Sequence, residues 1–261
     1  MTIRTGLCSV TYRQLDAAAI AVLAAGAGLE VIEWGGDVHV PPGDAARAAE
    51  VARITADAGL AVCSYGSYFR ADPGDEIAPV LDSAEALGAD RIRVWAGRIG
   101  SADATAAERS AVIDGLARAA ALAAERGISL ALEYHRGTLD DDDVQTLRVL
   151  DEVGAANLST YWQPSVAAPD EVALAEYERV AGRVSAAHVF SWWPAAERLP
   201  LTGRDALWRG FAAAVAATPA PPRDALLEFV VDDDPALLAA EAAALRGYLH
   251  GDDARVARLG A

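Results

Sequence analysis

In the middle of the chain stands the stretch Leu130-Ala131-Leu132-Glu133-Tyr134-His135-Arg136-Gly137, an apolar strand that runs into two ionisable side chains and a glycine. Side chains alternate along a strand, so Ala131, Glu133 and His135 share one face, and the leucines and Tyr134 share the other. Carboxylates and imidazoles are costly to bury unless something uses them. The pattern predicts either a barrel strand with Glu133 and His135 facing inward, or an ordinary strand that ends in a solvated loop.

Similar apolar runs of strand length recur along the whole chain, and helix-like stretches separate them. The strand-like runs are 3–10, 29–34, 60–65, 91–95, 128–134, 158–162, 185–190 and 225–231. The helix-like stretches are 16–25, 44–58, 76–87, 105–126, 141–153, 169–180, 207–217 and 235–249. Continuous apolar strands flanked by helices indicate a parallel sheet that is covered on both faces.

The number and order of these elements point to one architecture. Eight strands alternate with eight helices over 261 residues, a length typical of one (β/α)8 barrel, and no Pro-, Gly- or Ser-rich linker interrupts them. Several helices begin at a capping residue such as Asp16, Asp44 or Thr105, and several end at a glycine. We therefore predict a single-domain α/β protein, a (β/α)8 TIM barrel over residues 1–261, with a doubly wound open sheet as the alternative.

The charge and composition of the chain disfavour several classes of function. The formal net charge of −16 repels phosphate backbones and anionic lipid, so we expect no nucleic-acid partner and no membrane partner. No apolar run approaches the roughly 20 residues that a membrane helix requires, and the first residues do not resemble a signal peptide. A cytoplasmic protein is therefore expected. Cys8 and Cys63 have no metal-ligand spacing, so we predict that both are small core residues.

If the barrel is right, functional side chains should gather after the carboxyl ends of the strands, where the active-site loops of such barrels lie. Five of the 6 tryptophans and three of the 4 histidines fall there. Aromatic rings beside carboxylates and imidazoles suit a polyol, whose C–H faces stack on rings while its hydroxyls form hydrogen bonds. The predicted substrate-binding residues are Trp34, His39, Tyr65, Trp95, His135, Trp162, Trp192 and Arg198.

Four polar side chains end four consecutive strands of the predicted barrel, and such side chains can converge on one point. They are Glu133, Gln163, His188 and Glu228. Three oxygen ligands and one imidazole nitrogen suit Mn²⁺, Mg²⁺ or Zn²⁺ with positions left open for substrate oxygens. We therefore predict one divalent metal ion at these residues, with Glu133 and Glu228 also as catalytic groups. The alternative for His188 is a hydrogen-bonded histidine of the core.

Four short motifs carry a resemblance to a known family: Glu-Trp-Gly-Gly-Asp-Val-His at 33–39, Leu-Glu-Tyr-His-Arg-Gly-Thr-Leu at 132–139, Ala-His-Val-Phe at 187–190 and Leu-Glu-Phe-Val at 227–230. With them the chain resembles the xylose isomerase-like TIM barrel superfamily, in its branch of sugar isomerases and epimerases. In that family the fifth and eighth strands each supply a metal-binding glutamate, the seventh a histidine and the sixth usually an aspartate. Glu133, His188 and Glu228 match, whereas Gln163 stands in place of the aspartate. The resemblance therefore implies weaker binding of a more electrophilic metal.

The resemblance implies a metal-dependent sugar isomerase or epimerase that removes the proton beside the carbonyl of a keto-sugar and forms an enediolate. One glutamate is expected to take the proton and the other to return it. Two alternatives stay open, namely a lyase or deglycosidase that eliminates from an oxidised (keto) glycoside, and a non-catalytic sugar-binding barrel. The expected partner is a small-molecule sugar or glycoside, and the resemblance also allows a homo-oligomer.

Overall fold

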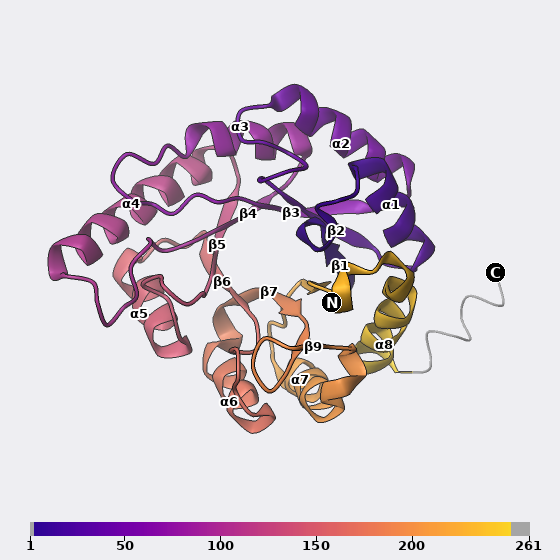
Figure 1. The fold of residues 1–261 in the computed structure, drawn as a ribbon. Coiled ribbons are helices and arrows are strands. Elements are labelled where there is room, and N and C mark those ends of the chain that lie inside the picture. Colours follow the sequence, from indigo (N-terminus) through magenta and orange to yellow (C-terminus); the bar gives the residue numbers. More distant parts are fainter. Residues whose placement is uncertain (1–2, 252–261) are drawn as a thin grey trace.

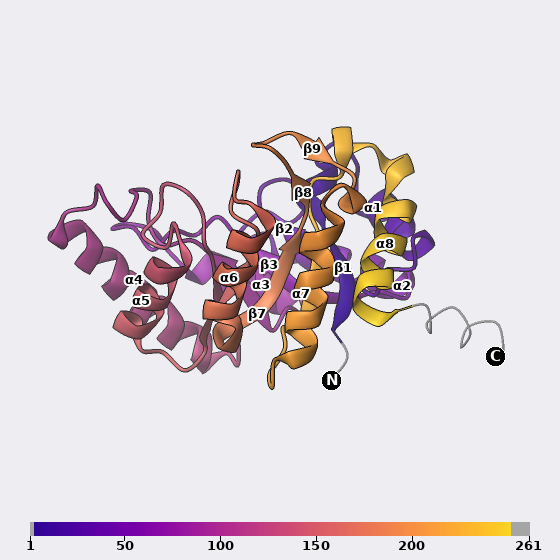
Figure 2. The same cartoon turned by 90° about the horizontal axis from the view of Figure 1, so that it is seen from below.

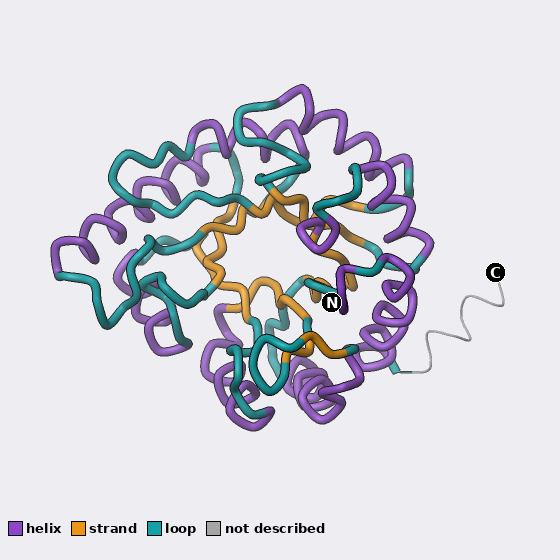
Figure 3. The backbone as a smooth tube through the Cα atoms, in the orientation of Figure 1, coloured by secondary structure: helices purple, strands orange, loops and turns teal. Residues whose placement is uncertain are grey.

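The computed structural model describes residues 3–251, which form one closed barrel of parallel strands inside a ring of helices, as Figure 1 and Figure 3 show. The barrel strands are β1 (Arg4–Cys8), β2 (Val31–Gly35), β3 (Ala61–Gly66), β4 (Arg91–Val94), β5 (Ser129–Glu133), β6 (Leu158–Trp162), β7 (Val184–Val189) and β10 (Asp224–Leu227). Because β1 pairs with β10 as well as with β2, the sheet is closed. The predicted (β/α)8 barrel is confirmed, and the open sheet is excluded.

The helices follow the strands in the predicted order. The α-helices are α1 (Ala17–Gly26), α2 (Ala45–Asp57), α3 (Ala78–Leu87), α4 (Ala106–Glu125), α5 (Asp143–Val153), α6 (Asp170–Val180), α7 (Asp205–Ala217) and α8 (Leu238–His250). Short 3₁₀ helices are η1 (Ser9–Tyr12), η2 (Ala181–Arg183), η3 (Leu201–Arg204), η4 (Val231–Asp233) and η5 (Pro235–Leu237). Within residues 3–251, none of the helices combines the length and the apolar character needed to cross a membrane.

Several helix ends follow signals in the sequence. Asp16 and Asp44 each accept a hydrogen bond from a backbone N–H of the first turn of α1 and α2, and Thr105 forms a capping box with Glu108 at the start of α4. Gly88 ends α3 with a φ of 77°, in the left-handed region that favours glycine. These local signals set where the helices begin and end around the barrel.

Side chains alternate between the two faces of the barrel strands. In β5, Leu130 and Leu132 pack towards the helices, whereas Ala131 belongs to the cluster inside the barrel. The other members of this interior cluster are Cys8, Val10, Val31, Cys63, Tyr161, Ala186 and Leu226. The predicted faces of the β5 strand are thus confirmed, and so is the burial of both cysteines, which are free thiols.

A buried ion pair fills the amino-terminal end of the barrel. Arg91 Nη2 lies 2.6 Å from Asp224 Oδ2, and the two side chains are 1% and 0% exposed. Arg4 Nε donates to the other oxygen of Asp224 at 2.7 Å, and Arg91 Nη1 donates to the backbone oxygen of Ser185 at 3.0 Å. This network joins β1, β4, β7 and β10 and forms a polar floor beneath the rest of the interior.

Two features at the carboxyl end differ from the prediction. The eighth strand ends at Leu227 instead of residue 231, because Phe229 has a φ of 52°, a left-handed conformation that a strand does not continue through. A hairpin of β8 (Ser191–Trp192) and β9 (Arg198–Leu199) was not foreseen. Figure 2 shows it beyond the end of the barrel opposite to the N-terminus. The hairpin brings Trp192 and Arg198 to the rim.

Gly115 in α4 lies against the segment that follows β3, and we expect Gly115→Ala to destabilise the protein. A Cβ at this position would lie 2.3 Å from the backbone oxygen of Ala71, which cannot move aside as a flexible side chain can. Overpacking of this kind costs about 1–3 kcal/mol. Urea unfolding measures the effect, and Gly26→Ala is the control, since a Cβ there meets no described atom within 4 Å apart from its chain neighbours and the backbone of its own helix. Equal stability of the two variants would contradict the prediction.

Candidate active site

Glu133, His188 and Glu228 meet at the carboxyl end of the barrel, where β5, β7 and β10 finish. Each offers one ligand atom, and these atoms lie within 4.8 Å of one another. His188 Nδ1 is 3.3 Å from Glu228 Oε2 and 3.8 Å from Glu133 Oε1. Gln163, the first residue after β6, places its Oε1 3.2 Å from the same nitrogen. The structure therefore brings all four predicted metal ligands together.

An ionic layer that the sequence analysis missed lies deeper in the barrel, next to these donors. Glu33 of β2 and Arg93 of β4 are 2% and 3% exposed. Arg93 Nε donates to Glu33 Oε1 at 3.1 Å, and Arg93 Nη1 pairs with Glu133 Oε2. The other oxygen of Glu33 accepts hydrogen bonds from Ser64 Oγ at 2.7 Å and Tyr161 Oη at 2.8 Å. The only sequence signal for this layer is a charged residue inside each of two apolar strands.

The charge of the combined cluster fits a divalent cation. Three carboxylates, those of Glu33, Glu133 and Glu228, lie around one guanidinium, that of Arg93. In the protonation state that binds metal, with Glu228 ionised and His188 neutral, this cluster carries two uncompensated negative charges. Because uncompensated charge is costly in a buried site, a divalent ion at the four donors would balance the cluster.

Cys8, Glu33 and His188 form a second group with metal-ligand spacing, but it fits a metal less well. Burial raises the pKa of the Cys8 thiol well above its ordinary value, whereas the thiolate is the form that binds metal. Both oxygens of Glu33 are already engaged by other side chains. The group formed by Glu133, His188 and Glu228 is therefore the better candidate.

The two glutamates of the site differ in their surroundings. Glu133 Oε2 accepts a hydrogen bond from Trp95 Nε1 at 2.8 Å and also pairs with Arg93. Burial would raise the pKa of Glu133, but Arg93 and His188 outweigh it and lower the pKa. Within the described residues no hydrogen bond reaches the Glu228 carboxylate, and burial raises its pKa to about 7. Glu133 is thus held as an anion, whereas Glu228 can gain and lose a proton.

Three of the four donors, Glu133, Gln163 and Glu228, line a pocket of about 340 Å³ with one polar and one aromatic side. The polar side includes Glu133, His135, Gln163 and Glu228, and the aromatic side includes Phe190, Trp192 and Phe229. The ring of His135 stacks on Trp95 at 4.7 Å between centroids. The guanidinium carbon of Arg198 lies 5.0 Å from the Phe229 ring and 5.8 Å from the Trp192 ring. Four predicted substrate-binding residues, Trp95, His135, Trp192 and Arg198, therefore lie in or beside this pocket.

Trp34 and Trp162 lie outside the barrel wall, which corrects the expectation that they line the pocket. Trp34 Nε1 donates to Thr55 Oγ1 of α2 at 3.0 Å. The Trp162 ring stacks on Phe211 of α7 with centroids 4.9 Å apart. Each tryptophan directly follows an inward-facing residue of its strand, so the pleat turns it towards the helices.

Tyr65 and His39 are also engaged away from the pocket, contrary to expectation. Tyr65 Oη donates to the backbone oxygen of Val40 at 2.7 Å. The two ring nitrogens of His39 lie 2.9 Å from Ser9 Oγ and 3.1 Å from the backbone oxygen of Leu15. These hydrogen bonds hold the loop after β2 against β3 and the segment after β1, and they leave the polar atoms of both side chains already engaged.

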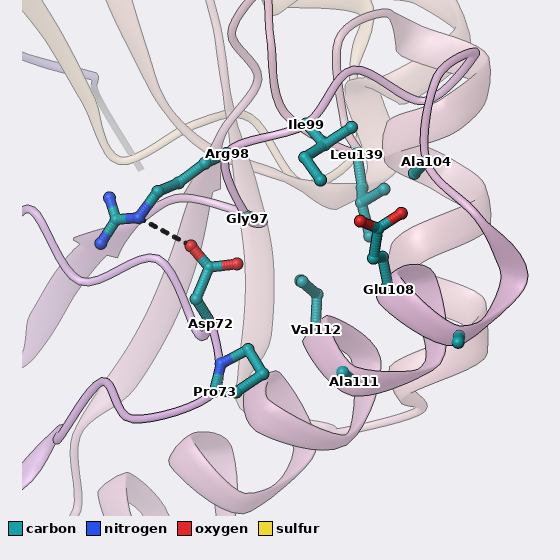
Figure 4. Close-up of a pocket in the computed structure, with 11 residues that line it drawn as sticks. Asp72, Pro73, Gly97, Arg98, Ile99, Ala104, Glu108, Ala111, Val112 and Leu139 are labelled. Carbon is teal, nitrogen blue, oxygen red and sulfur yellow. Dashed lines mark ion pairs between the residues drawn. The ribbon is translucent and has the colours of Figure 1, made fainter.

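A separate apolar cavity of about 260 Å³ lies between the loop after β4 and the beginning of α4, as Figure 4 shows. Ile99, Val112 and Leu139 contribute apolar side chains to its wall. An ion pair between Arg98 and Asp72, 2.8 Å apart, stands at its edge. The residues predicted from the sequence to form the site are not among those that line this cavity.

Asp140, in the loop between β5 and α5, is fully buried, and we expect it to make stability depend on pH. Its Oδ1 accepts a hydrogen bond from Thr138 Oγ1 at 2.8 Å, whereas Oδ2 has no partner among the described residues. Burial raises the pKa of this carboxyl to about 7. An aspartic acid in the unfolded chain loses its proton near about pH 4. Between about pH 4 and pH 7 the proton is therefore bound to Asp140 in the folded state and absent in the unfolded state. Stability therefore falls as the pH rises from about 4 to 7.

Asp140→Asn should remove this pH dependence, because the amide still accepts the hydrogen bond from Thr138 and carries no charge. Relative to the wild type, the variant should gain roughly 3 kcal/mol between pH 5 and pH 8. Urea unfolding in the presence of EDTA at several pH values measures this difference. Parallel stability profiles of the two proteins would contradict the prediction.

The chain belongs to the xylose isomerase-like TIM barrel family, whose model matches residues 21–244. This match confirms the resemblance inferred from the four motifs. A comparison with curated proteins finds no match.

Several solved structures have the same fold. The probable 3-DHS dehydratase AsbF of Bacillus anthracis is 19% identical, with 94% of this chain and 98% of that chain covered and a TM-score of 0.76. The 3-keto-D-glucoside 4-epimerase YcjR of E. coli is 14% identical, with 94% and 99% covered and a TM-score of 0.73. The D-psicose 3-epimerase of Clostridium cellulolyticum H10 is 13% identical, with 95% and 99% covered and a TM-score of 0.72. At these identities the likeness establishes the shared fold.

Proposed function

We propose that this protein is a metal-dependent isomerase or epimerase that acts on a keto-sugar or sugar derivative in the cytoplasm. The observation that carries the proposal is the meeting of Glu133, His188 and Glu228 with the amide oxygen of Gln163 at the bottom of a pocket that Glu133, Gln163 and Glu228 line. Similar folds that include epimerases of a ketose and of a keto-glucoside support the substrate class. Assembly as a homo-oligomer stays a prediction from the resemblance.

The chemistry follows from how these residues are held. A divalent ion bound by the four donors would polarise the sugar carbonyl and stabilise the negative charge that develops beside it. Glu228 removes the proton from the carbon next to the carbonyl, and the C–H electron pair becomes the double bond of an enediolate. Arg93 and Trp95 keep Glu133 ionised and in place. His135 offers a hydrogen bond to a sugar hydroxyl, and Trp192 shields the pocket from water.

A lyase or deglycosidase is the second candidate, and the aromatic side of the pocket favours it. Phe190, Trp192 and Phe229 form a surface beyond the polar donors on which a substituent of the sugar could lie. The same removal of a proton leads to elimination when a good leaving group is attached to the carbon beta to the carbonyl. An oxidised glycoside would meet this condition.

Metal analysis of the wild type and of Gln163→Asp tests the first part of the proposal. The substitution adds a third carboxylate to the donors, so the variant should bind Mn²⁺ or Zn²⁺ at least about tenfold more tightly. Mass spectrometry of the bound metal after dialysis and calorimetric titration give the measurement. If neither protein holds stoichiometric metal, the proposal is abandoned.

Exchange of solvent deuterium into a panel of keto-sugars tests the second part. An enzyme that removes the proton beside the carbonyl incorporates deuterium, whereas a sugar-binding barrel without catalysis incorporates none. Product analysis with 3-keto-glycosides then separates the two candidates, because an epimerase returns an isomer and a lyase releases the aglycone.

A further inference from the structure

Glu33 is a buried carboxylate that the four metal donors leave without a role. It lies in the middle of β2, is 2% exposed, and is surrounded by side chains from five other strands. A buried charge is costly even when it is paired. A carboxylate at this position therefore calls for an explanation in terms of its neighbours.

The contacts of Glu33 leave one direction open, towards His188. Oε2 accepts from Ser64 and Tyr161, and Oε1 accepts from Arg93 Nε at 3.1 Å and from the Cys8 thiol at 3.9 Å. Oε1 also faces His188 Nε2 at 3.6 Å. That nitrogen is buried, and no hydrogen bond satisfies it within the described residues.

The two nitrogens of the His188 ring thus have different surroundings. Nδ1 faces Gln163, Glu133 and Glu228, which are the other metal donors, whereas Nε2 faces Glu33. A histidine can present a lone pair at Nδ1 only when the proton of the neutral ring is on Nε2. An acceptor beside Nε2 selects this tautomer, and such an acceptor also orients the ring.

We propose that Glu33 is a positioning residue that accepts the Nε2 proton of His188 and so fixes Nδ1 as a metal ligand; this inference rests on the proposed function. Ser64, Tyr161 and Arg93 hold Glu33 from three sides, which keeps it from moving into the donor set itself. The 3.6 Å separation is longer than a hydrogen bond, and we expect it to shorten when Nδ1 is engaged.

Arg93 makes the arrangement specific. Its guanidinium binds Glu33 through Nε and Glu133 through Nη1. One buried cation therefore positions both the donor Glu133 and the carboxylate of Glu33, which lies behind the donor His188. Planar guanidinium groups hold carboxylates in a defined geometry. The layer of Glu33 and Arg93 therefore orients two of the four donors from behind.

Affinity for Zn²⁺, measured by competition calorimetry, tests the proposal with two variants and a control. Glu33→Gln should weaken binding about 10–100-fold, because the glutamine amide can donate to Nε2 and favour the wrong tautomer. Tyr161→Phe keeps every charge and removes one anchor of Glu33, so it should weaken binding in the same direction by a smaller factor. Glu30→Gln, at an exposed position three residues earlier, should bind like the wild type. Thermal melts in EDTA show whether each variant is folded.

Nitrogen-15 spectra of histidine-labelled, zinc-loaded protein give a direct second readout. In the wild type, Nε2 of His188 should carry the proton and Nδ1 should carry the metal, and this pattern should change in Glu33→Gln.

The possible outcomes distinguish a failure of the proposed function from a failure of the positioning role of Glu33. A wild type that binds no zinc ends the proposed function, and the inference falls with it before any variant is compared. A wild type that binds zinc while both variants match its affinity overturns the inference alone. A third outcome also overturns positioning. If Glu33→Gln binds zinc more weakly, Tyr161→Phe binds it as the wild type does, and the His188 tautomer is unchanged in Glu33→Gln, then Glu33 acts through its charge only.

Discussion

Replacing Glu228 by glutamine should stop the exchange of substrate protons with D₂O, with a fall of about 10²–10⁴-fold in rate. Among the described residues no N–H or O–H donates a hydrogen bond to the Glu228 carboxylate, and burial raises its pKa to about 7. Glutamine keeps an oxygen that can bind metal but cannot accept the proton. Exchange is followed by mass spectrometry of the sugar, with metal content measured in the same samples.

The expected result depends on the asymmetry between the two glutamates. The sequence suggested that one glutamate takes the proton and the other returns it. In the structure Arg93 and Trp95 hold Glu133 Oε2, and the pKa of Glu133 is lowered while burial raises that of Glu228, so Glu228 is the better proton carrier of the two. Glu228→Gln should therefore abolish exchange from either epimer of a substrate pair. Exchange that persists for one epimer would show that Glu133 is a second base.

A matched control removes a carboxylate elsewhere in the barrel. Glu241 of α8 accepts a hydrogen bond from the backbone nitrogen of Leu201 at 2.7 Å. Its glutamine variant keeps an acceptor oxygen, so both the fold and the exchange rate should be unchanged. A comparable loss of exchange in Glu241→Gln would mean that the effect at Glu228 is not local.

The fold could be predicted because its signals are local and periodic. Alternating apolar runs, caps such as Asp16 and Thr105, and glycines after helices specify each element from a few neighbouring residues. Side-chain alternation also placed Leu130 and Leu132 towards the helices. The four predicted metal donors could be placed close together for the same reason, since each stands at or next to the end of its own strand.

Trp34 and Trp162 were wrongly placed in the pocket because their position near a strand end was given more weight than the alternation of side chains between the two faces of the strand. Trp34 and Trp162 stand at strand ends, but the residues before them, Glu33 and Tyr161, are the ones that point inward. Applied consistently, the rule that placed Glu133 inside would have placed these two tryptophans outside.

The layer of Glu33 and Arg93 could not be predicted in full, because its pairing depends on register. Alternation alone places Arg91 and Arg93 on one face of β4, yet it does not say which carboxylate meets which guanidinium. Their partners, Asp224 and Glu33, lie on strands far away in the sequence. The register also shifts between Ile32 and Glu33, and a sequence pattern does not reveal such a shift.

Asp224→Ala should produce the largest loss of stability among the variants considered. Removing this carboxylate leaves the buried guanidinium of Arg91 with one hydrogen-bond acceptor among residues 3–251, the backbone oxygen of Ser185, and it also releases Arg4. Breaking a buried ion pair from one side costs about 3–5 kcal/mol. For a protein of this size, that corresponds to a fall in melting temperature of about 6–20 °C.

Asp90→Ala is the matched control at the same end of the barrel, because it also removes an aspartate from an arginine pair. Asp90 lies 2.7 Å from Arg223, but the two side chains are 62% and 45% exposed. Solvent screens such a pair, so its loss should cost about 0–1 kcal/mol. Calorimetric melts of both variants measure the contrast. Equal losses would mean that water reaches Arg91 once Asp224 is gone, and that this ion pair does not hold the floor of the barrel together.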